Sequence, residues 1–222
     1  METVNREQVN AGQAVYSKLT LAIYDSLVLG LSCRWLWRCK ASLMQQQYDD
    51  LSSNNHLDVG VGSGYFLDHC YFSSLSPRVA LMDLNASSLR FTSSRIARYE
   101  PETYQRNVLE DMSVDGKPGF DSVGMNFLLH CVPGSMDYKG RIFARCHGVM
   151  NSGAVLFGAT ILGAGVQPNW GARKLMAVYN RKGIFSNQQD SVAALEAQLN
   201  KYFRNVQVHV EGCVALFSAY KP

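Results

Sequence analysis

Four residues between positions 58 and 64 have the types and the spacing needed to bind a charged ligand. They form a D-x-G-x-G-x-G pattern at the point where an apolar run gives way to a helical pattern: Asp58, Gly60, Gly62 and Gly64. Glycines accept positive φ and let the backbone approach a ligand closely. A carboxylate before the turn suits a ligand that carries an ammonium group better than one that carries phosphates. A purely structural glycine-rich turn is the alternative interpretation.

Two further apolar runs also end in polar side chains. Asp83 ends RVALMD about 20 residues past the glycines, where an acid in nucleotide-binding folds accepts hydrogen bonds from ribose hydroxyls. The alternative for Asp83 is a cap on the helix predicted at 86–99. Asn107 ends TYQRN, and its side-chain oxygen could accept from an adenine amino group while the Val108 amide donates to the ring. A turn, or a cap for a short helix in LEDM, is the alternative for Asn107.

A fourth run, FDSVGMN, ends at Asn126 and is followed by Phe127 and His130. Ligands of open α/β sheets bind outside the carboxyl ends of parallel strands, near the point where the strand order reverses. We therefore expect all four strand ends to face one crevice.

Apolar runs alternate with helical patterns from residue 56 onward, which is typical of βαβ units in a parallel sheet. The exception is the end of the chain, where only Gly212 separates the last two runs, so the final strand should be antiparallel. Strands are predicted at 56–60, 78–84, 103–108, 120–126, 154–162, 205–211 and 213–221, and helices at 64–75, 86–99, 136–150 and 191–203.

Composition narrows the class of protein. The 222 residues are 47% hydrophobic, with a formal charge of +3 and no basic block, which argues for a globular chain and against a nucleic-acid partner. The six cysteines lack metal-ligand spacing and indicate reduced thiols in the cytoplasm. The apolar stretch 19–32 contains Asp25 and is too short for stable membrane insertion. No signal-peptide pattern begins the sequence, and no metal site is expected.

The order DVGVGSGYF, MDLN, RNVLED, FDSVGMNFLLHCV and GAVLFGATIL resembles the class I S-adenosylmethionine-dependent methyltransferases, with the small-molecule branch the most similar. The resemblance covers about residues 56–221. It implies an α/β, Rossmann-like sheet of seven mostly parallel strands in the order 3-2-1-4-5-7-6, with the last strand antiparallel. We expect one domain over 1–222, in which an N-terminal helical cap (1–52) contacts the substrate and a core (53–222) binds the cofactor.

The resemblance also implies roles for individual residues. Residues 58–64 would hold the methionine part of S-adenosylmethionine, Asp83 the ribose, and Asn107 with Val108 the adenine. Asp is more common than Asn at the adenine position in related sequences. The full set predicted to bind S-adenosylmethionine, and its product S-adenosylhomocysteine (SAH), is Asp58, Gly60, Gly62, Gly64, Tyr65, Asp83, Leu84, Asn107, Val108, Asn126 and Phe127.

Methyl transfer from a sulfonium is an in-line displacement, so the protein mainly positions the acceptor. The candidate catalytic residues are His130, Tyr16 and Tyr24, with His130 favoured slightly as a positioning group over a general base. A packed histidine is its alternative. The expected substrate is a small, largely apolar metabolite methylated at O, N or C, bound between the cap and a second wall formed by residues 163–190.

Two other functions compete with this interpretation. The chain could bind the cofactor without transferring its methyl group, as a cyclisation or rearrangement catalyst or as a non-catalytic subunit. An NAD-linked oxidoreductase is disfavoured by the glycine spacing and by the predicted terminal hairpin.

Overall fold

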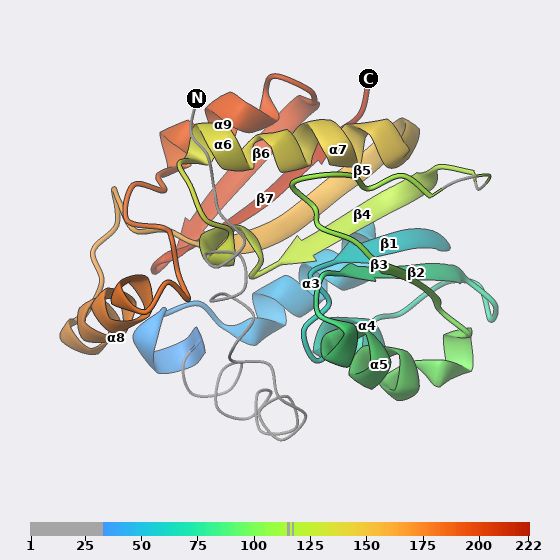
Figure 1. Ribbon diagram of the computed structural model, residues 1–222, viewed down its shortest axis with the longest axis horizontal. Helices are drawn as coiled ribbons and strands as arrows, with labels where there is room; N and C mark the ends of the chain where they lie inside the picture. The colour runs from blue at the N-terminus through green and yellow to red at the C-terminus, as the bar shows by residue number, and fades with distance from the viewer. Residues whose placement is uncertain (1–32, 115, 117) are drawn as a thin grey trace.

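A seven-stranded sheet forms the centre of the computed structural model, which describes residues 33–114, 116 and 118–222 (Figure 1). Its order is β3-β2-β1-β4-β5-β7-β6, as predicted. Strands β1 to β5 pair in parallel, whereas β7 runs antiparallel to both β5 and β6. The strands are β1 (Asn55–Val59), β2 (Arg78–Asp83), β3 (Glu102–Gln105), β4 (Phe120–Asn126), β5 (Met150–Ile161), β6 (Arg204–Glu211) and β7 (Val214–Tyr220).

Helices cover both faces of the sheet and bury a separate apolar cluster on each (Figure 1). One face packs against α3 (Ala41–Leu51), α4 (Tyr65–His69), α5 (Ala86–Arg95) and α8 (Trp170–Arg181). The other packs against α6 (Met136–Lys139), α7 (Arg141–Val149) and α9 (Val192–Leu199). There are also two short 3-10 turns, η2 (Ala97–Tyr99) and η3 (Leu129–Cys131).

Several boundaries differ from the sequence predictions. The edge strand β3 ends at Gln105, not at 108, because its single partner in the sheet, β2, ends at the paired residue Asp83. The helix predicted at 64–75 ends at His69. The helix predicted at 136–150 is divided at Gly140, where a Cβ would lie 2.3 Å from Gln198 Oε1.

A buried ion pair connects α6 with the segment that follows α8. Lys139 Nζ donates to Asp190 Oδ2 and to the Ser186 carbonyl, each at 2.6 Å, and both charged side chains are almost fully buried. The Ser186 amide in turn donates to the His130 carbonyl at 2.8 Å. The pair therefore fixes the segment against which η3, and with it His130, is placed.

Replacement of Asp190 by Asn should lower the free energy of unfolding by about 3–5 kcal/mol, because it removes the buried carboxylate that the Lys139 ammonium group contacts at 2.6 Å. Urea denaturation measures this. Lys201→Ala removes an exposed ion pair to Asp137, at 3.7 Å, and should cost less than about 1 kcal/mol. Equal losses in the two variants would contradict a stabilising role for the buried pair.

Candidate active site

The glycine-rich turn joins β1 to α4 with a left-handed backbone. Gly60, Gly62 and Gly64 have φ of +74°, +52° and +71°. A Cβ on Gly60 would lie 3.0 Å from Leu128 Cδ1, and one on Gly64 would lie 2.5 Å from Thr92 Cγ2. Among the described residues, a Cβ on Gly62 would meet no atom within 4 Å. Gly60 and Gly64 are therefore enclosed by side chains, whereas Gly62 borders open space that a ligand can fill.

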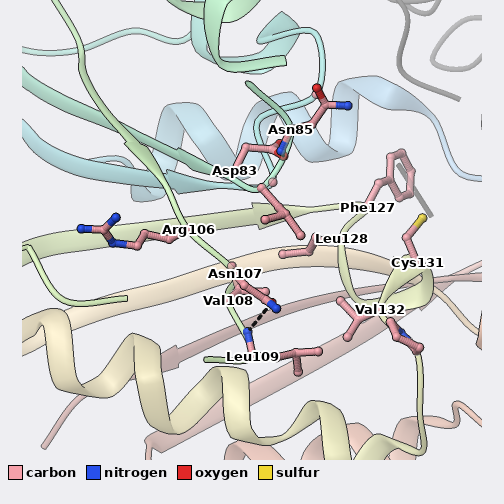
Figure 2. A pocket seen from close by; sticks show the side chains of 14 residues that line it. Asp83, Asn85, Arg106, Asn107, Val108, Leu109, Phe127, Leu128, Cys131 and Val132 are labelled. Carbon is pink, nitrogen blue, oxygen red and sulfur yellow. Dashed lines mark hydrogen bonds between the residues drawn. The ribbon is translucent and has the colours of Figure 1, made fainter. Parts of the chain in front are cut away.

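Two pockets meet at this turn, and both contain Gly60, Gly62 and Phe127. The first, called the Asp83 pocket, encloses about 720 Å³ including its open mouth (Figure 2). It is lined by Gly60, Gly62, Asp83, Leu84, Asn85, Arg106, Asn107, Val108, Leu109, Phe127, Leu128, Cys131, Val132 and Pro133. The second, called the Asp58 pocket, is lined by Tyr48, Asp58, Gly60, Val61, Gly62, Ser63, Gly64, Tyr65, Phe66, Asn126 and Phe127. Every residue predicted to bind the cofactor lines one of these two pockets.

Asp83 does not cap the following helix. Asn85 is the cap of α5, and its Oδ1 accepts from the amides of Ser87 and Ser88 at 2.8 and 3.4 Å. Asp83 Oδ1 accepts instead from the Asn85 amide at 2.8 Å. Burial raises the pKa of the Asp83 carboxyl to about 6, and backbone amides, first that of Asn85 and then that of Gly62, limit the rise. The alternative role for Asp83 is thus wrong, and its carboxylate faces the pocket (Figure 2).

Asn107 forms a turn on the opposite side of the same pocket. Its Oδ1 accepts from the Leu109 amide at 3.1 Å, and its Nδ2 donates to Glu110 Oε1 at 3.0 Å. Residues 108–110 form a turn, and LEDM (109–112) forms no helix, so the turn is the correct one of the two structural alternatives. An amide oxygen accepts two hydrogen bonds, so this turn still leaves an acceptor position for a ligand.

Asp58 lies in the second pocket and is almost completely buried. Tyr48 Oη donates to Asp58 Oδ1 at 2.7 Å. Burial raises the pKa of the Asp58 carboxyl to about 7; the Tyr48 hydroxyl opposes this rise and the nearby Asp83 adds to it. This pKa is higher than the value of about 3.9 in the unfolded chain, so proton binding by Asp58 favours the folded, ligand-free protein. The stabilisation is complete at low pH. This stabilisation is lost as the pH rises through about 7.

Asn126 is the clearest sign that the second pocket receives a polar ligand. Its side chain is about nine-tenths buried, and neither Oδ1 nor Nδ2 has a hydrogen-bond partner within the described part of the chain. Buried amide groups are almost always paired, because an unpaired one loses its hydration without compensation. A ligand with both donors and acceptors would satisfy this side chain.

His130 lies beside the pockets and lines neither of them. It is buried between the rings of Phe127 and Phe185, whose centroids lie 5.6 and 4.5 Å from its own. Its Nδ1 accepts from the Ile161 amide at 3.3 Å. Burial and then Lys139 lower the pKa of its imidazole to about 3. The other predicted catalytic residues, Tyr16 and Tyr24, lie outside the described residues.

Tyr48 is a residue of this site that the sequence did not indicate. It belongs to α3, inside the segment predicted as a cap, and no motif or spacing relates it to Asp58. Its place in the pocket depends on how α3 packs against the sheet, which local sequence patterns do not encode.

Gly62→Ala should reduce the affinity for S-adenosylmethionine about tenfold or more, because the added methyl group enters the space between the two pockets. Gly153→Ala is the matched control, since Gly153 also has a positive φ (+79°) and no neighbour within 4 Å. Both variants should unfold at similar temperatures. Calorimetric titration at one pH compares their affinities, and equal values would show that the Gly62 turn is only structural.

Comparison with known proteins now identifies the family. The family described as "Methyltransferase domain" matches residues 57–156. Demethylluteothin O-methyltransferase from Streptomyces thioluteus is 40% identical over 96% of this chain and 93% of its own length. The physcion biosynthesis cluster O-methyltransferase from Aspergillus chevalieri is 38% identical over 95% of each chain.

A solved structure shares this fold. The solved DhpI–SAH complex superposes with a TM-score of 0.70, at 13% identity, over 98% of both chains. The turn at Gly62, the acid at Asp83 and the unpaired amide at Asn126 suit that class of cofactor. This chain belongs to the methyltransferases, and within them to the class I enzymes that use S-adenosylmethionine.

Proposed function

We propose that this enzyme transfers the methyl group of S-adenosylmethionine to a hydroxyl oxygen of a small, largely apolar metabolite. The choice of oxygen over nitrogen or carbon is supported by the names of the two relatives, both of them O-methyltransferases. Those names also favour methyl transfer over cofactor binding without transfer. The observation that carries the proposal is the pair of pockets, lined by acidic and amide groups, that meets at Gly62.

In this proposal the Asp83 pocket holds the nucleoside of the cofactor. The Asp83 carboxylate accepts from the ribose hydroxyls, and Asn107 with the Val108 amide binds the adenine edge. The apolar side chains of Leu84 and Leu109 cover the ring faces. The Asp58 pocket holds the amino acid part, with Asp58 and Asn126 opposite its ammonium and carboxylate groups. The cofactor supplies an activated methyl group on a sulfonium.

The acceptor is proposed to bind near the aromatic cluster around His130. Phe185 lies 6.1 Å from Trp37, 5.0 Å from Tyr179 and 4.5 Å from His130, measured between ring centroids. Trp170, expected in the same wall, is instead 70% exposed and stacks under the Lys174 ammonium group. An aromatic alcohol bound beside this buried aromatic cluster would find apolar contacts.

We propose His130 as a hydrogen-bond donor that positions the acceptor. With Nδ1 occupied as an acceptor for the Ile161 amide, the neutral imidazole carries its proton on Nε2. A ring with a pKa of about 3 remains neutral across the physiological range and gains no proton from the acceptor at neutral pH. Tyr16 and Tyr24 remain proposed positioning groups of the cap over 1–52.

The cellular setting is also a proposal. All six cysteines are free, which supports a reducing compartment such as the cytoplasm, and the relatives' names support a role in small-molecule biosynthesis. Within residues 33–114, 116 and 118–222, no helix has the length and apolar character needed to cross a membrane.

Transfer can be tested with methyl-labelled S-adenosylmethionine and a panel of small phenols and matched aryl amines. We expect the label on phenolic oxygen, located by intact-mass and fragment analysis of the product. The wild-type protein should also bind SAH in calorimetry. Label on the amines alone would overturn the choice of oxygen, and cofactor binding with no labelled product across the panel would favour the non-transferring alternative.

His130→Ala should lower kcat about tenfold to a hundredfold and leave the Kd of S-adenosylmethionine nearly unchanged, because one hydrogen bond to the acceptor is lost. Between pH 5 and 8, the kcat of the wild type should show no change with pH that comes from ionisation of this imidazole. His209→Ala, on an exposed strand position, is the control. If the kcat of the wild type changes with pH near 6.5 and this change disappears in His130→Ala, His130 is a general base instead.

A further inference from the structure

Tyr48 is held by a cage of aromatic rings at the inner end of the Asp58 pocket. Its ring stacks on Phe66 at 5.3 Å and meets the edges of Phe157 at 5.1 Å and His56 at 6.0 Å, measured between centroids. The side chain is 1% exposed. A ring packed on three sides has little rotational freedom, so its hydroxyl occupies a fixed position beside the Asp58 carboxylate.

The direction of the hydrogen bond between these residues is determined by their chemistry. Burial and the adjacent Asp58 raise the pKa of the Tyr48 hydroxyl well above its ordinary value, so the hydroxyl keeps its proton. It therefore donates to Asp58 Oδ1, at 2.7 Å. The Val59 amide also stabilises the carboxylate. A carboxylate offers about four acceptor positions, so Asp58 can accept these bonds and still receive a ligand donor.

Within the part of the chain that the structure describes, the other titratable groups around Asp58 add no positive charge. His56, two residues earlier on β1, has a pKa lowered by burial to about 3, and its Nδ1 pairs with Ser122 Oγ at 2.8 Å. Asp83, at the end of β2, is acidic, and the pKa of the Cys70 thiol, after α4, is raised by burial to about 11. The stabilisation of an ionised Asp58 thus depends strongly on the hydroxyl of Tyr48.

We propose that Tyr48 is a positioning residue whose hydroxyl orients Asp58 and maintains it as the acceptor for the ammonium group of the cofactor. This inference rests on the proposed placement of the amino acid part of S-adenosylmethionine in the Asp58 pocket. It gives the N-terminal segment a part in cofactor binding, because α3 precedes the predicted cofactor-binding core and α3 carries Tyr48.

The test compares the Kd of S-adenosylmethionine for the wild type, Tyr48→Phe and Asp58→Asn between pH 5.5 and 8.5. Phe keeps the packed ring and removes only the hydroxyl. Wild-type affinity should rise as the pH passes through about 7, where Asp58 ionises in the free enzyme. In Tyr48→Phe that midpoint should move about 1–2 pH units higher. Asp58→Asn should bind weakly, without this rise.

Tyr104→Phe is the matched control, because Tyr104 also donates its hydroxyl to a carboxylate, that of Glu102, at the start of β3 and away from the pockets. Its pH midpoint should equal that of the wild type. The same midpoint in Tyr48→Phe, or a loss of affinity that is uniform over pH, would overturn the inference. A wild type with no affinity at any pH would instead contradict the placement of the cofactor, and thermal unfolding confirms that each variant is folded.

Discussion

The site depends on the parallel pairing of β1 with β2 on one side and β4 on the other. That register places Asp58 opposite Leu81 and Gly124, so the ends of the three strands lie at the same level of the sheet. The chain proceeds outward from β1 to β3 in one direction and then from β4 to β5 in the other. The strand order reverses between β1 and β4, so the loops that leave these two adjacent strands diverge there. The two pockets occupy the space that this divergence leaves.

Close packing behind the pockets makes small residues necessary at particular points. A Cβ on Gly124 would lie 3.1 Å from both Asp58 Oδ1 and His56 Cε1. A glycine in β4 therefore makes room for two buried polar side chains on β1, those of Asp58 and His56. The same requirement explains why Gly60 and Gly64 are enclosed while Gly62 is open. In the glycine motif, packing therefore requires Gly60 and Gly64, whereas Gly62 leaves space for a ligand.

The sheet order could be predicted from the resemblance to the class I methyltransferases, and the strand-end residues that line the pockets could be predicted because strand ends carry their signal locally. An apolar run followed by Asp83 or Asn107 needs no tertiary information to be recognised. Tyr48, the Asn85 cap and the division between α6 and α7 could not be predicted in this way. Each depends on a partner distant in the sequence or on competition between adjacent polar side chains, such as Asp83 and Asn85 before α5. Sequence periodicity gives the elements, whereas the hydrogen-bond partners come from packing.

The charges of Asp58 and Asp83 relate the two pockets to the kind of ligand that they can bind. Burial raises the pKa of the Asp58 carboxyl to about 7, and the charge of the nearby Asp83 adds to this rise. Two neighbouring buried carboxylates make ionisation costly in the free protein. A ligand that brings an ammonium group next to one and ribose hydroxyls next to the other removes much of that cost, whereas an anionic ligand would increase it. With the cofactor placed as proposed, the two acids would therefore favour a ligand by its charge. The Tyr48 hydroxyl and the backbone amides at Asp83 keep the selection effective near neutral pH, because they stabilise the ionised forms that burial alone would disfavour.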